Sequence, residues 1–269
     1  MKYDPVKRSL GSVFNRTPFL RKVFYHLLNL LLLRSWHIRK ELRRIRKTLP
    51  SDPEILDAGS GFGQYDYTMS VQLPGARITA VDVKQEQIDD CNNFFERIGK
   101  ADRVKFKYGD LTRYSDPEKY DLVLSVDVME HIEDDVAVFK NFAVSLKKGG
   151  VLLISTPSDQ GGSDVHDDHE DSFIEEHVRD GYAIEDIEAK LKTAGFSSIE
   201  SRYAYGTPGK ISWKLSMKWP IMMANANKIL LVLLPFYYLI TYPVSFVLNM
   251  IDVKSRHKTG TGLIVKAVK

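Results

Sequence analysis

Residues 54–63 read Glu-Ile-Leu-Asp-Ala-Gly-Ser-Gly-Phe-Gly, and this stretch decides the fold. Ile55 and Leu56 indicate the end of a buried strand, and Asp57 follows them directly. Glycine then occupies positions 59, 61 and 63. Alternating glycines permit positive φ angles and a close approach of the backbone to a ligand, because no Cβ stands in the way. The backbone N–H groups of a turn that opens into a helix face such a ligand. We therefore expect a ligand-binding turn here.

Predicted strands and helices alternate on both sides of this turn. After the strand that ends at Asp57, the expected strands are Arg77–Asp82, Val104–Asp110, Tyr120–Val126, Val151–Ser155, Ser197–Tyr205 and Gly262–Val268. The expected helices between them include Gln64–Gln72, Gln85–Ile98 and Ile132–Leu146. This alternation indicates an α/β fold, a doubly wound, Rossmann-like sheet of seven mostly parallel strands. Such sheets bind ligands outside the carboxyl ends of their strands.

Acidic residues stand at the ends of four predicted strands, at Asp57, Asp82, Asp110 and Asp127. The glycine spacing is G-x-G-x-G with an acid two residues before it, whereas the dinucleotide-binding fingerprint is G-x-G-x-x-G. The next acid follows about 20 residues later, the separation of one βαβ unit. Across residues 50–205 this pattern resembles the class I S-adenosylmethionine (SAM)-dependent methyltransferases.

The resemblance implies SAM as cofactor and a role for each matching residue. Asp57 and the turn of Gly59, Ser60, Gly61 and Gly63 would surround the methionyl part of SAM, with Ser125 nearby. Asp82 would accept hydrogen bonds from the ribose hydroxyls, with Val83 against the adenine. Asp110 and Leu111 would flank the adenine, the carboxylate accepting from the exocyclic amine.

Candidate chemical residues follow the fourth strand. On a helix, Asp127, Glu130 and His131 would share one face at the mouth of the pocket. This motif resembles that of the ubiquinone-type O-methyltransferases, in which two glutamates and a histidine at this spacing can hold a divalent cation. Here Asp127 replaces the first glutamate, so acid–base catalysis, acceptor positioning and structural capping stay open beside a metal site. His177 is a further catalytic candidate, in an acidic stretch after the fifth strand.

An apolar segment lies between the last two predicted strands. We divide the chain into an N-terminal helical segment (1–49), a SAM-binding domain (50–206), an apolar helical insertion (207–260) and the last strand (261–269). Residues 229–251 carry no charge and are long enough to span a bilayer. In the class I fold both ends of this insertion lie on the catalytic edge, so a single crossing is excluded. Pro235 and Pro243 predict a bent helical pair that dips into one leaflet or serves only as a lid.

The N-terminal segment joins leucines to a basic run. Phe19–Trp36 is leucine-rich, and Arg34–Lys47 holds seven Lys or Arg against the single Glu41. On one continuous helix this pattern is typical of an anionic membrane surface. A helix packed on the sheet is the alternative, and a nucleic-acid patch is not favoured because no recognition motif accompanies it. The single cysteine, Cys91, and the lack of a signal-peptide pattern indicate the cytoplasm, with contact at the inner face of a membrane.

The predicted reaction is therefore SAM-dependent O-methylation of an apolar or lipid-like acceptor at a membrane surface. C-methylation of a similar acceptor and O-methylation of a small soluble phenol or carboxylate are alternatives. A SAM-binding or membrane-docking module without catalysis is a third. Net charge is only +3, so the prediction of membrane binding rests on the uneven distribution of charge rather than on its total.

Overall fold

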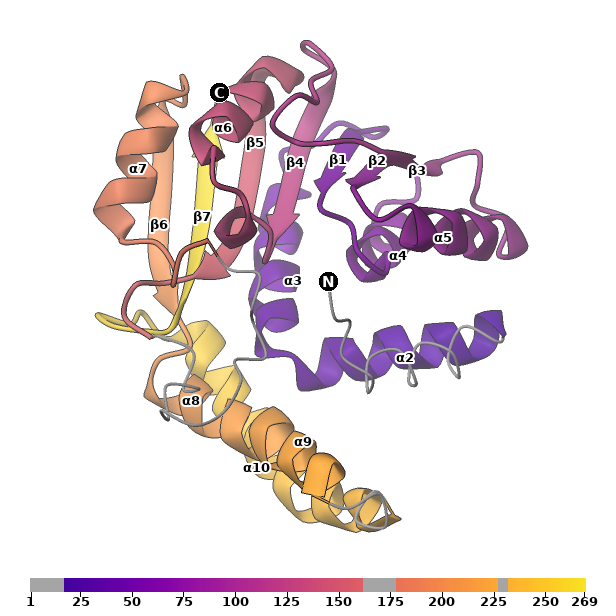
Figure 1. Ribbon diagram of the computed structural model, residues 1–269, viewed down its shortest axis with the longest axis vertical. Helices are drawn as coiled ribbons and strands as arrows, with labels where there is room; N and C mark the ends of the chain where they lie inside the picture. The colour runs from indigo at the N-terminus through magenta and orange to yellow at the C-terminus, as the bar shows by residue number, and fades with distance from the viewer. Residues whose placement is uncertain (1–16, 162–177, 227–231) are drawn as a thin grey trace.

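The computed structural model describes residues 17–161, 178–226 and 232–269. These residues form a seven-stranded sheet in the order β3-β2-β1-β4-β5-β7-β6 (Figure 1). All strands run parallel except β7, which is antiparallel to β5 and β6. The strands are β1 (Glu54–Ala58), β2 (Arg77–Asp82), β3 (Val104–Tyr108), β4 (Tyr120–Val126), β5 (Leu146–Pro157), β6 (Ser198–Ala204) and β7 (Gly262–Val268). The predicted seven-stranded, mostly parallel α/β fold is confirmed.

Helices cover both faces of this sheet. One face carries α2 (Pro18–Leu31), α3 (Leu33–Ile45), α4 (Gln64–Gln72) and α5 (Gln85–Arg97). The other face carries α6 (Asp135–Ser145) and α7 (Ile184–Thr193). Successive strand residues point to opposite faces, so Ile55 belongs to the first core and Leu56 to the second. Burial on both faces explains why the strands read as continuous apolar runs rather than alternating ones.

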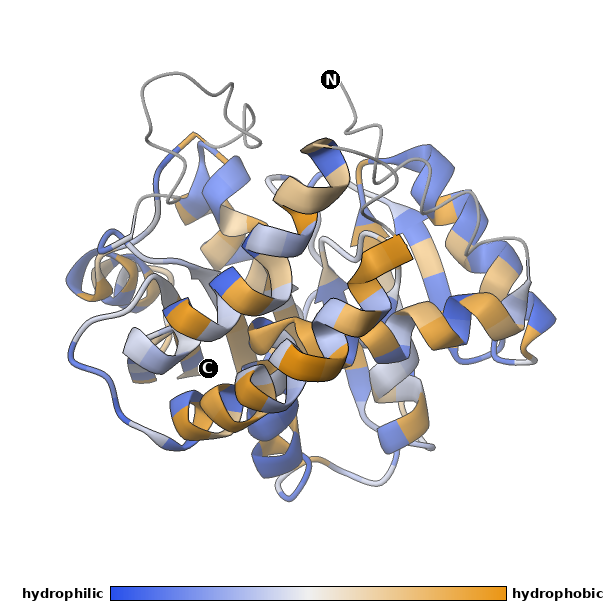
Figure 2. Cartoon of the chain, turned by 90° about the horizontal axis from the view of Figure 1, so that it is seen from below, coloured by the Kyte–Doolittle hydropathy of each residue, from blue (hydrophilic) through white to orange (hydrophobic). Residues whose placement is uncertain are grey.

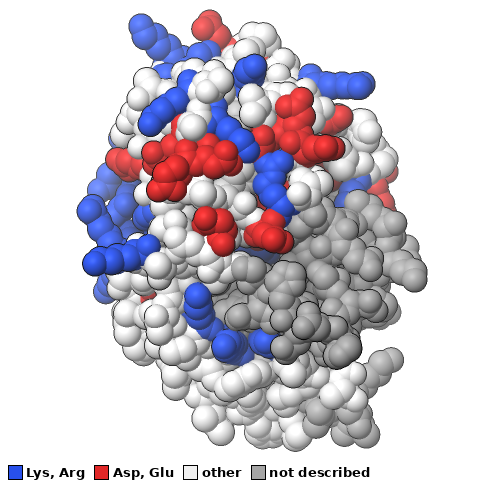
Figure 3. Space-filling view, turned by 60° about the vertical axis from the view of Figure 1, so that its left-hand side comes forward, with Lys and Arg blue, Asp and Glu red and all other residues white. Residues whose placement is uncertain are grey.

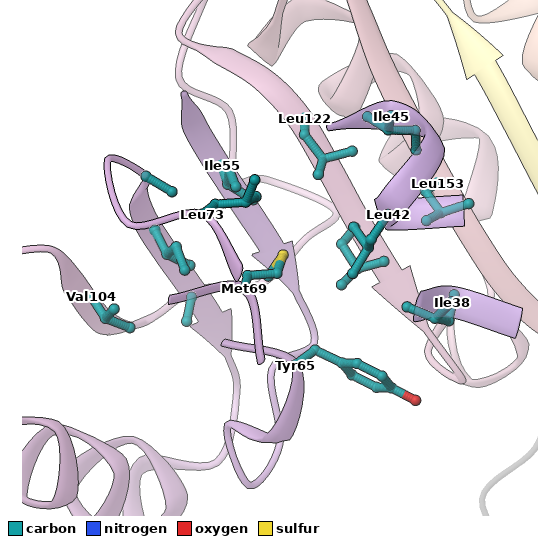
Figure 4. Close-up of a cluster of buried hydrophobic side chains, with 14 of the residues drawn as sticks. Ile38, Leu42, Ile45, Ile55, Tyr65, Met69, Leu73, Val104, Leu122 and Leu153 are labelled. Carbon is teal, nitrogen blue, oxygen red and sulfur yellow. The ribbon is translucent and has the colours of Figure 1, made fainter. Parts of the chain in front are cut away.

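The N-terminal segment forms two helices, so the prediction of one continuous helix is wrong. Leu32 adopts an extended conformation (φ −85°, ψ 111°) and separates α2 from α3. Figure 4 shows the apolar side of α3 turned toward the sheet, with Ile38, Leu42 and Ile45 near Leu122 and Leu153. The apolar side of α3 thus packs on the sheet, which is the alternative to a membrane-surface helix, whereas Phe19, Leu27 and Leu30 of α2 stay exposed. The basic side chains at the end of α3 face solvent.

A helical insertion projects from the sheet between β6 and β7 (Figure 1). It comprises α8 (Thr207–Trp213), the π-helix η2 (Lys214–Lys218), α9 (Trp219–Ala226) and α10 (Leu234–Lys254). The Ser212 hydroxyl donates to the Ser245 carbonyl at 3.2 Å, and the Tyr238 hydroxyl donates to the Ser216 carbonyl at 2.8 Å. Ser212 thus contacts Ser245, whereas Ser216, four residues later, contacts Tyr238, seven residues earlier than Ser245. The helix α10 therefore runs antiparallel to α8 and η2. We call this structure the apolar hairpin.

The helix α10 is continuous from Leu234 to Lys254, contrary to the expectation that Pro235 and Pro243 break it into a helical pair. Pro235 lies in its first turn, where the missing N–H has no helical partner in any case. Pro243 lies inside the helix but is exposed. The carbonyl that it leaves without a donor can therefore bond to water.

A buried carboxylate fixes the root of the apolar hairpin. Asp252 of α10 is fully buried and accepts from the backbone N–H groups of Gly209 at 3.0 Å and Tyr205 at 3.2 Å. The Nε2 atom of His37 in α3 lies 2.9 Å from the same carboxylate. In the sheet, Gly262 pairs with both Ala204 and Pro157, so the hairpin leaves from the carboxyl edge of the parallel strands.

Candidate active site

The glycine turn after β1 adopts the positive φ angles that its sequence predicts. Gly59, Gly61 and Gly63 have φ angles of 87°, 50° and 74°. The N–H groups of Gly59 and Ser60 donate to the Val81 carbonyl at 2.8 and 3.2 Å, which ties the turn to β2. A Cβ at Gly59 would stand 2.2 Å from Val128 Cγ2. Position 59 therefore requires glycine both for its φ angle and for space.

Asp82 lies beside this turn at the carboxyl end of β2. Its Oδ2 accepts from the N–H of Gly61 at 2.8 Å, and its Oδ1 accepts from the N–H of Lys84 at 2.9 Å. These two bonds fix the orientation of the carboxylate. A carboxylate has about four lone-pair sites, so Asp82 keeps acceptor capacity for the two hydroxyls of a ribose.

The residues predicted to hold the adenine lie at the ends of β2 and β3. Val83 is exposed, whereas Leu111 is buried. Asp110 is exposed, and its Oδ1 accepts from the hydroxyl and the N–H of Thr112 at 2.7 and 2.9 Å. These hydrogen bonds hold the pKa of Asp110 below its usual value. Asp110 is therefore an ionised acceptor, as recognition of an amine requires.

Within the glycine turn and the two strands β1 and β4 beside it, three buried polar atoms have no hydrogen-bond partner in the described part of the chain. They are Asp57 Oδ2, Ser60 Oγ and Ser125 Oγ. Asp57 pairs with Leu124 across the sheet, which places Ser125 on the neighbouring strand. An unpaired buried polar group costs about 1–3 kcal/mol, so three together indicate a polar ligand. A carboxylate and two hydroxyls suit the ammonium and carboxylate of the methionyl group of SAM, and these residues therefore fit that cofactor.

Asp66 adds a second carboxyl group that the sequence analysis missed. It lies in the first turn of α4 and is fully buried beside the Asp57 carboxyl, and neither of its oxygens has a hydrogen-bond partner in the described part of the chain. Burial and the proximity of Asp57 raise the pKa of Asp66. Burial also raises the pKa of Asp57, to about 7. The pair therefore retains a proton near neutral pH.

The prediction that Asp127, Glu130 and His131 share one helical face is wrong. Asp127 has a φ angle of 52° and precedes the short 3₁₀-helix η1 (Met129–His131). Glu130 is buried, whereas His131 is exposed. Within the described ranges no three His, Cys, Asp or Glu side chains form a group that could hold a metal ion. The tighter 3₁₀ geometry directs these side chains apart. His177 lies outside the described residues.

Glu130 and Asp127 have different surroundings. Glu130 Oε2 accepts from the Thr156 hydroxyl at 3.1 Å. Burial, followed by the nearby Asp127, raises the pKa of Glu130 to about 8. Asp127 forms an ion pair with Arg34 of α3. At neutral pH the described site thus holds a neutral carboxyl at Glu130, which is not prepared to act as a base.

The N-terminal helices hold the glycine turn, a role that the sequence analysis did not predict. Arg21 of α2 is buried and donates to the Phe62 carbonyl at 3.1 Å and to Asp90 at 2.6 Å. The Tyr25 hydroxyl donates to the same Phe62 carbonyl. Nothing in the local sequence indicates these contacts, because the partners lie far apart in the chain. The basic residues Arg21 and Arg34 therefore belong to the site rather than to an outer surface.

This strand order, with β7 antiparallel, a glycine turn after β1 and an acid after β2, defines the class I SAM-dependent methyltransferase fold. A family model described as "Methyltransferase domain" matches residues 50–204. The chain belongs to this family. The matched range coincides with the region in which the sequence resembles the class I enzymes.

The chain is similar to several proteins of known name, of which two curated relatives and one solved structure are examples. Phosphoethanolamine N-methyltransferase 1 of Zea mays is 32% identical over 151 residues, which are 54% of this chain and 28% of the maize protein. Ubiquinone biosynthesis O-methyltransferase of Rickettsia bellii is 30% identical over 108 residues, 39% of this chain and 42% of that protein. The chain thus spans less than half the length of these relatives. Phosphoethanolamine N-methyltransferase 2 of Haemonchus contortus, solved with SAM, has a TM-score of 0.62 and 19% identity, over 97% of this chain and 59% of that one.

Proposed function

We propose that this chain transfers a methyl group from SAM to an oxygen atom of an apolar, lipid-like acceptor at the cytoplasmic surface of an anionic membrane. In this reaction the acceptor oxygen attacks the methyl carbon and the carbon–sulfur bond breaks, its electron pair passing to sulfur. The sulfonium supplies the leaving group, so the protein mainly positions the acceptor and excludes water. The observation that carries the proposal is the exposed apolar surface of the hairpin at the catalytic edge.

The apolar hairpin leaves many large side chains in solvent. Figure 2 views the molecule from below, where many turns of its helices are coloured as hydrophobic. Figure 3 shows charged groups mainly in the upper part of one face and mostly uncharged atoms below. Phe236, Leu239 and Ile240 are 67%, 75% and 75% exposed. A contiguous apolar surface of this kind marks an interaction site.

A membrane is the occupant that this surface fits best. The helix α10 is long and apolar enough to cross a bilayer by length and composition, and only 11% of its apolar window is buried. Both arms start at the same edge of the sheet, so the hairpin enters and leaves on one side. Insertion into one leaflet stabilises binding by about 1.5–3 kcal/mol for each large apolar side chain that becomes fully buried. Three such side chains suffice for peripheral binding.

The exposed basic residues at the end of α3 lie away from the apolar hairpin. Arg34 at the start of α3 pairs with Asp127 at the catalytic edge, whereas Arg43, Arg46 and Lys47 stand at the other end of this helix, just before β1 enters the sheet at its opposite edge. Attraction between charges decays over a Debye length of about 10 Å at 0.1 M salt, which is shorter than a helix of 13 residues at about 1.5 Å each. In this proposal the hairpin, rather than the basic end of α3, therefore makes the membrane contact.

The alternative reaction, C-methylation of a lipid-like acceptor, would use the same apolar hairpin to reach the membrane. For a small soluble phenol or carboxylate as acceptor, the hairpin is a lid only, and the protein does not bind vesicles. Vesicle co-sedimentation separates these possibilities. Tyr238 is unsuitable as a probe because its hydroxyl holds the two arms together.

We expect Leu239→Ser/Ile240→Ser to lose vesicle binding at low and high salt. Charge reversal at Arg43 and Arg46 should leave vesicle binding nearly unchanged, since these residues stand at the end of α3 that is remote from the hairpin. Val144→Ser is the matched control, since Val144 is an exposed apolar residue of α6, on the face opposite α3. If the wild type stays in solution with anionic vesicles, or if the control and hairpin variants behave alike, the membrane proposal is refuted.

A further inference from the structure

A cavity of about 190 Å³ lies where the N-terminal helices meet the root of the apolar hairpin. The residues that line it come from the α2–α3 junction, from the end of β6 and from the first arm of the hairpin. They are Leu31, Leu32, Leu33, Arg34, Tyr205, Trp213, Ser216 and Met217.

Three departures from regular backbone geometry meet at this cavity. Leu32 interrupts the N-terminal helices in an extended conformation. Ser216 and Met217 belong to the π-helix η2, a form that is rare and common at functional sites. Tyr205 has a φ angle of 56°, which is strained for a residue with a side chain. Strain like that at Tyr205 clusters at ligand sites, so this cavity is a candidate binding site.

Arg34 is the one charged residue among those that line the cavity. Its N–H donates to the Tyr205 hydroxyl at 2.9 Å, which fixes the start of α3. One guanidinium nitrogen pairs with Asp127, while the buried Nε has no partner in the described chain. A guanidinium offers five donors, so Arg34 retains donors for an anionic oxygen group. The apolar Leu31, Leu33 and Met217 complete the wall.

The Arg34 side chain links this cavity to the cofactor side of the domain. Arg34 reaches Asp127, which directly follows β4 at the catalytic edge. The Tyr65 hydroxyl lies 3.3 Å from the Ser35 hydroxyl and interacts electrostatically with Arg34, Asp127 and Asp57. Arg34 thus stands between the cavity and the acids of the turn. A group held by Arg34 would lie on the route to the methyl donor.

We propose that this cavity binds the acidic oxygen head of an amphiphilic methyl acceptor, a carboxylate or phosphate on an apolar body, with Arg34 as its anchor. The inference rests on the proposed function and names the class of its acceptor. Bidentate pairing with Arg34 suits the planar geometry of such groups. The apolar body then continues along Trp213 and Met217 toward the exposed hairpin.

Arg34 also fits a site in which the buried Glu130 is held neutral. An ionised oxygen needs no base, because attack on the methyl carbon yields the methyl ester and S-adenosylhomocysteine without a proton transfer. The cation keeps the acceptor ionised, since an opposite charge nearby favours the charged form. The neutral Glu130 and the exposed His131 then need no catalytic proton chemistry.

Calorimetry on the full chain, saturated with S-adenosylhomocysteine, tests this assignment. The probes are dodecanoate, dodecyl phosphate and the uncharged dodecanol, each below its micelle concentration. Arg34→Met should weaken binding of both anions at least tenfold and leave dodecanol unchanged. Arg43→Met, an exposed change of equal charge on the same helix, should alter neither. The anion that binds the wild type more tightly identifies the head group.

Two further variants distinguish the loss of a binding group from a folding defect in Arg34→Met. Arg34→Met/Asp127→Asn removes both partners of the ion pair, so no buried charge remains unpaired. Met217→Trp fills the opposite wall and should weaken all three probes while preserving affinity for S-adenosylhomocysteine. Equal binding of dodecanoate by wild type and both Arg34 variants overturns the inference. Loss of vesicle binding by the wild type with intact Arg34-dependent dodecanoate binding refutes only the membrane proposal.

Discussion

Replacing Gly59 with alanine tests whether the glycine turn needs both a positive φ angle and space at this position, and the structure gives the expected loss of stability. The φ angle of 87° is unfavourable for alanine by about 1–2 kcal/mol. The new Cβ would also stand 2.2 Å from Val128 Cγ2, and overpacking of this kind costs about 1–3 kcal/mol. The free energy of unfolding should therefore fall by about 2–5 kcal/mol. If the turn instead moves to relieve the contact, it shifts Gly61 away from Asp82, and a loss of about 2 kcal/mol in SAM binding is about 30-fold.

Gly149→Ala is the matched control. Gly149 has a φ angle of 78°, but a Cβ there would meet no atom within 4 Å. The control should lose only about 1–2 kcal/mol of stability and bind SAM normally. Urea unfolding and calorimetric titration with SAM measure both quantities. Equal effects of the two substitutions on stability and on SAM affinity would refute the argument that position 59 lacks space for a side chain.

Two further predictions concern buried acids. The pKa of Glu130 is about 8 in the folded state against an ordinary value of 4.5, so its contribution to stability is lost as pH rises from about 4.5 to about 8. Glu130→Gln should therefore stabilise the protein at pH 8 more than at pH 5 in urea unfolding, and an equal difference at both pH values contradicts the assignment. Burial also raises the pKa of Asp57 and Asp66, and a cationic ligand favours their ionised forms. SAM should then bind more tightly as pH rises through about 7, with proton release that Asp66→Asn reduces. Identical binding heats for the wild type in buffers of different ionisation enthalpy would exclude this coupling.

The fold could be predicted from the sequence because its determinants are local. The apolar runs of β2, β4 and β7 have the predicted bounds, and Gly59–Gly63 form the predicted turn. Continuous apolar runs indicate strands buried on both faces and helical periodicity indicates helices packed on one side, so the strand order follows once the family pattern is seen. The same reasoning failed after β4, where Asp127 takes a positive φ angle and a 3₁₀-helix replaces the expected helical face.

The polar site was less predictable because its contacts join distant segments. Arg34 was interpreted as one member of a basic run, yet it pairs with Asp127, 93 positions later. Arg21 likewise lies in a stretch that resembled a membrane-surface helix, and it is buried on the glycine turn. A charge pattern reports which residues are basic, whereas the fold decides which of them meet an acid. Asp66 had no distinguishing pattern, since one acid in a helix is ordinary until its burial beside Asp57 is known.

The identity of the methylated product tests the account most directly. The full chain is incubated with SAM carrying a labelled methyl group and with lipid extracted from the membranes of its host. The account predicts that label enters the organic phase on a molecule that bears an acidic oxygen before reaction. Arg34→Met should abolish this transfer, and alkaline hydrolysis of a carboxylate product should release labelled methanol. Label found only on water-soluble amines, with none in the lipid fraction, would contradict the account.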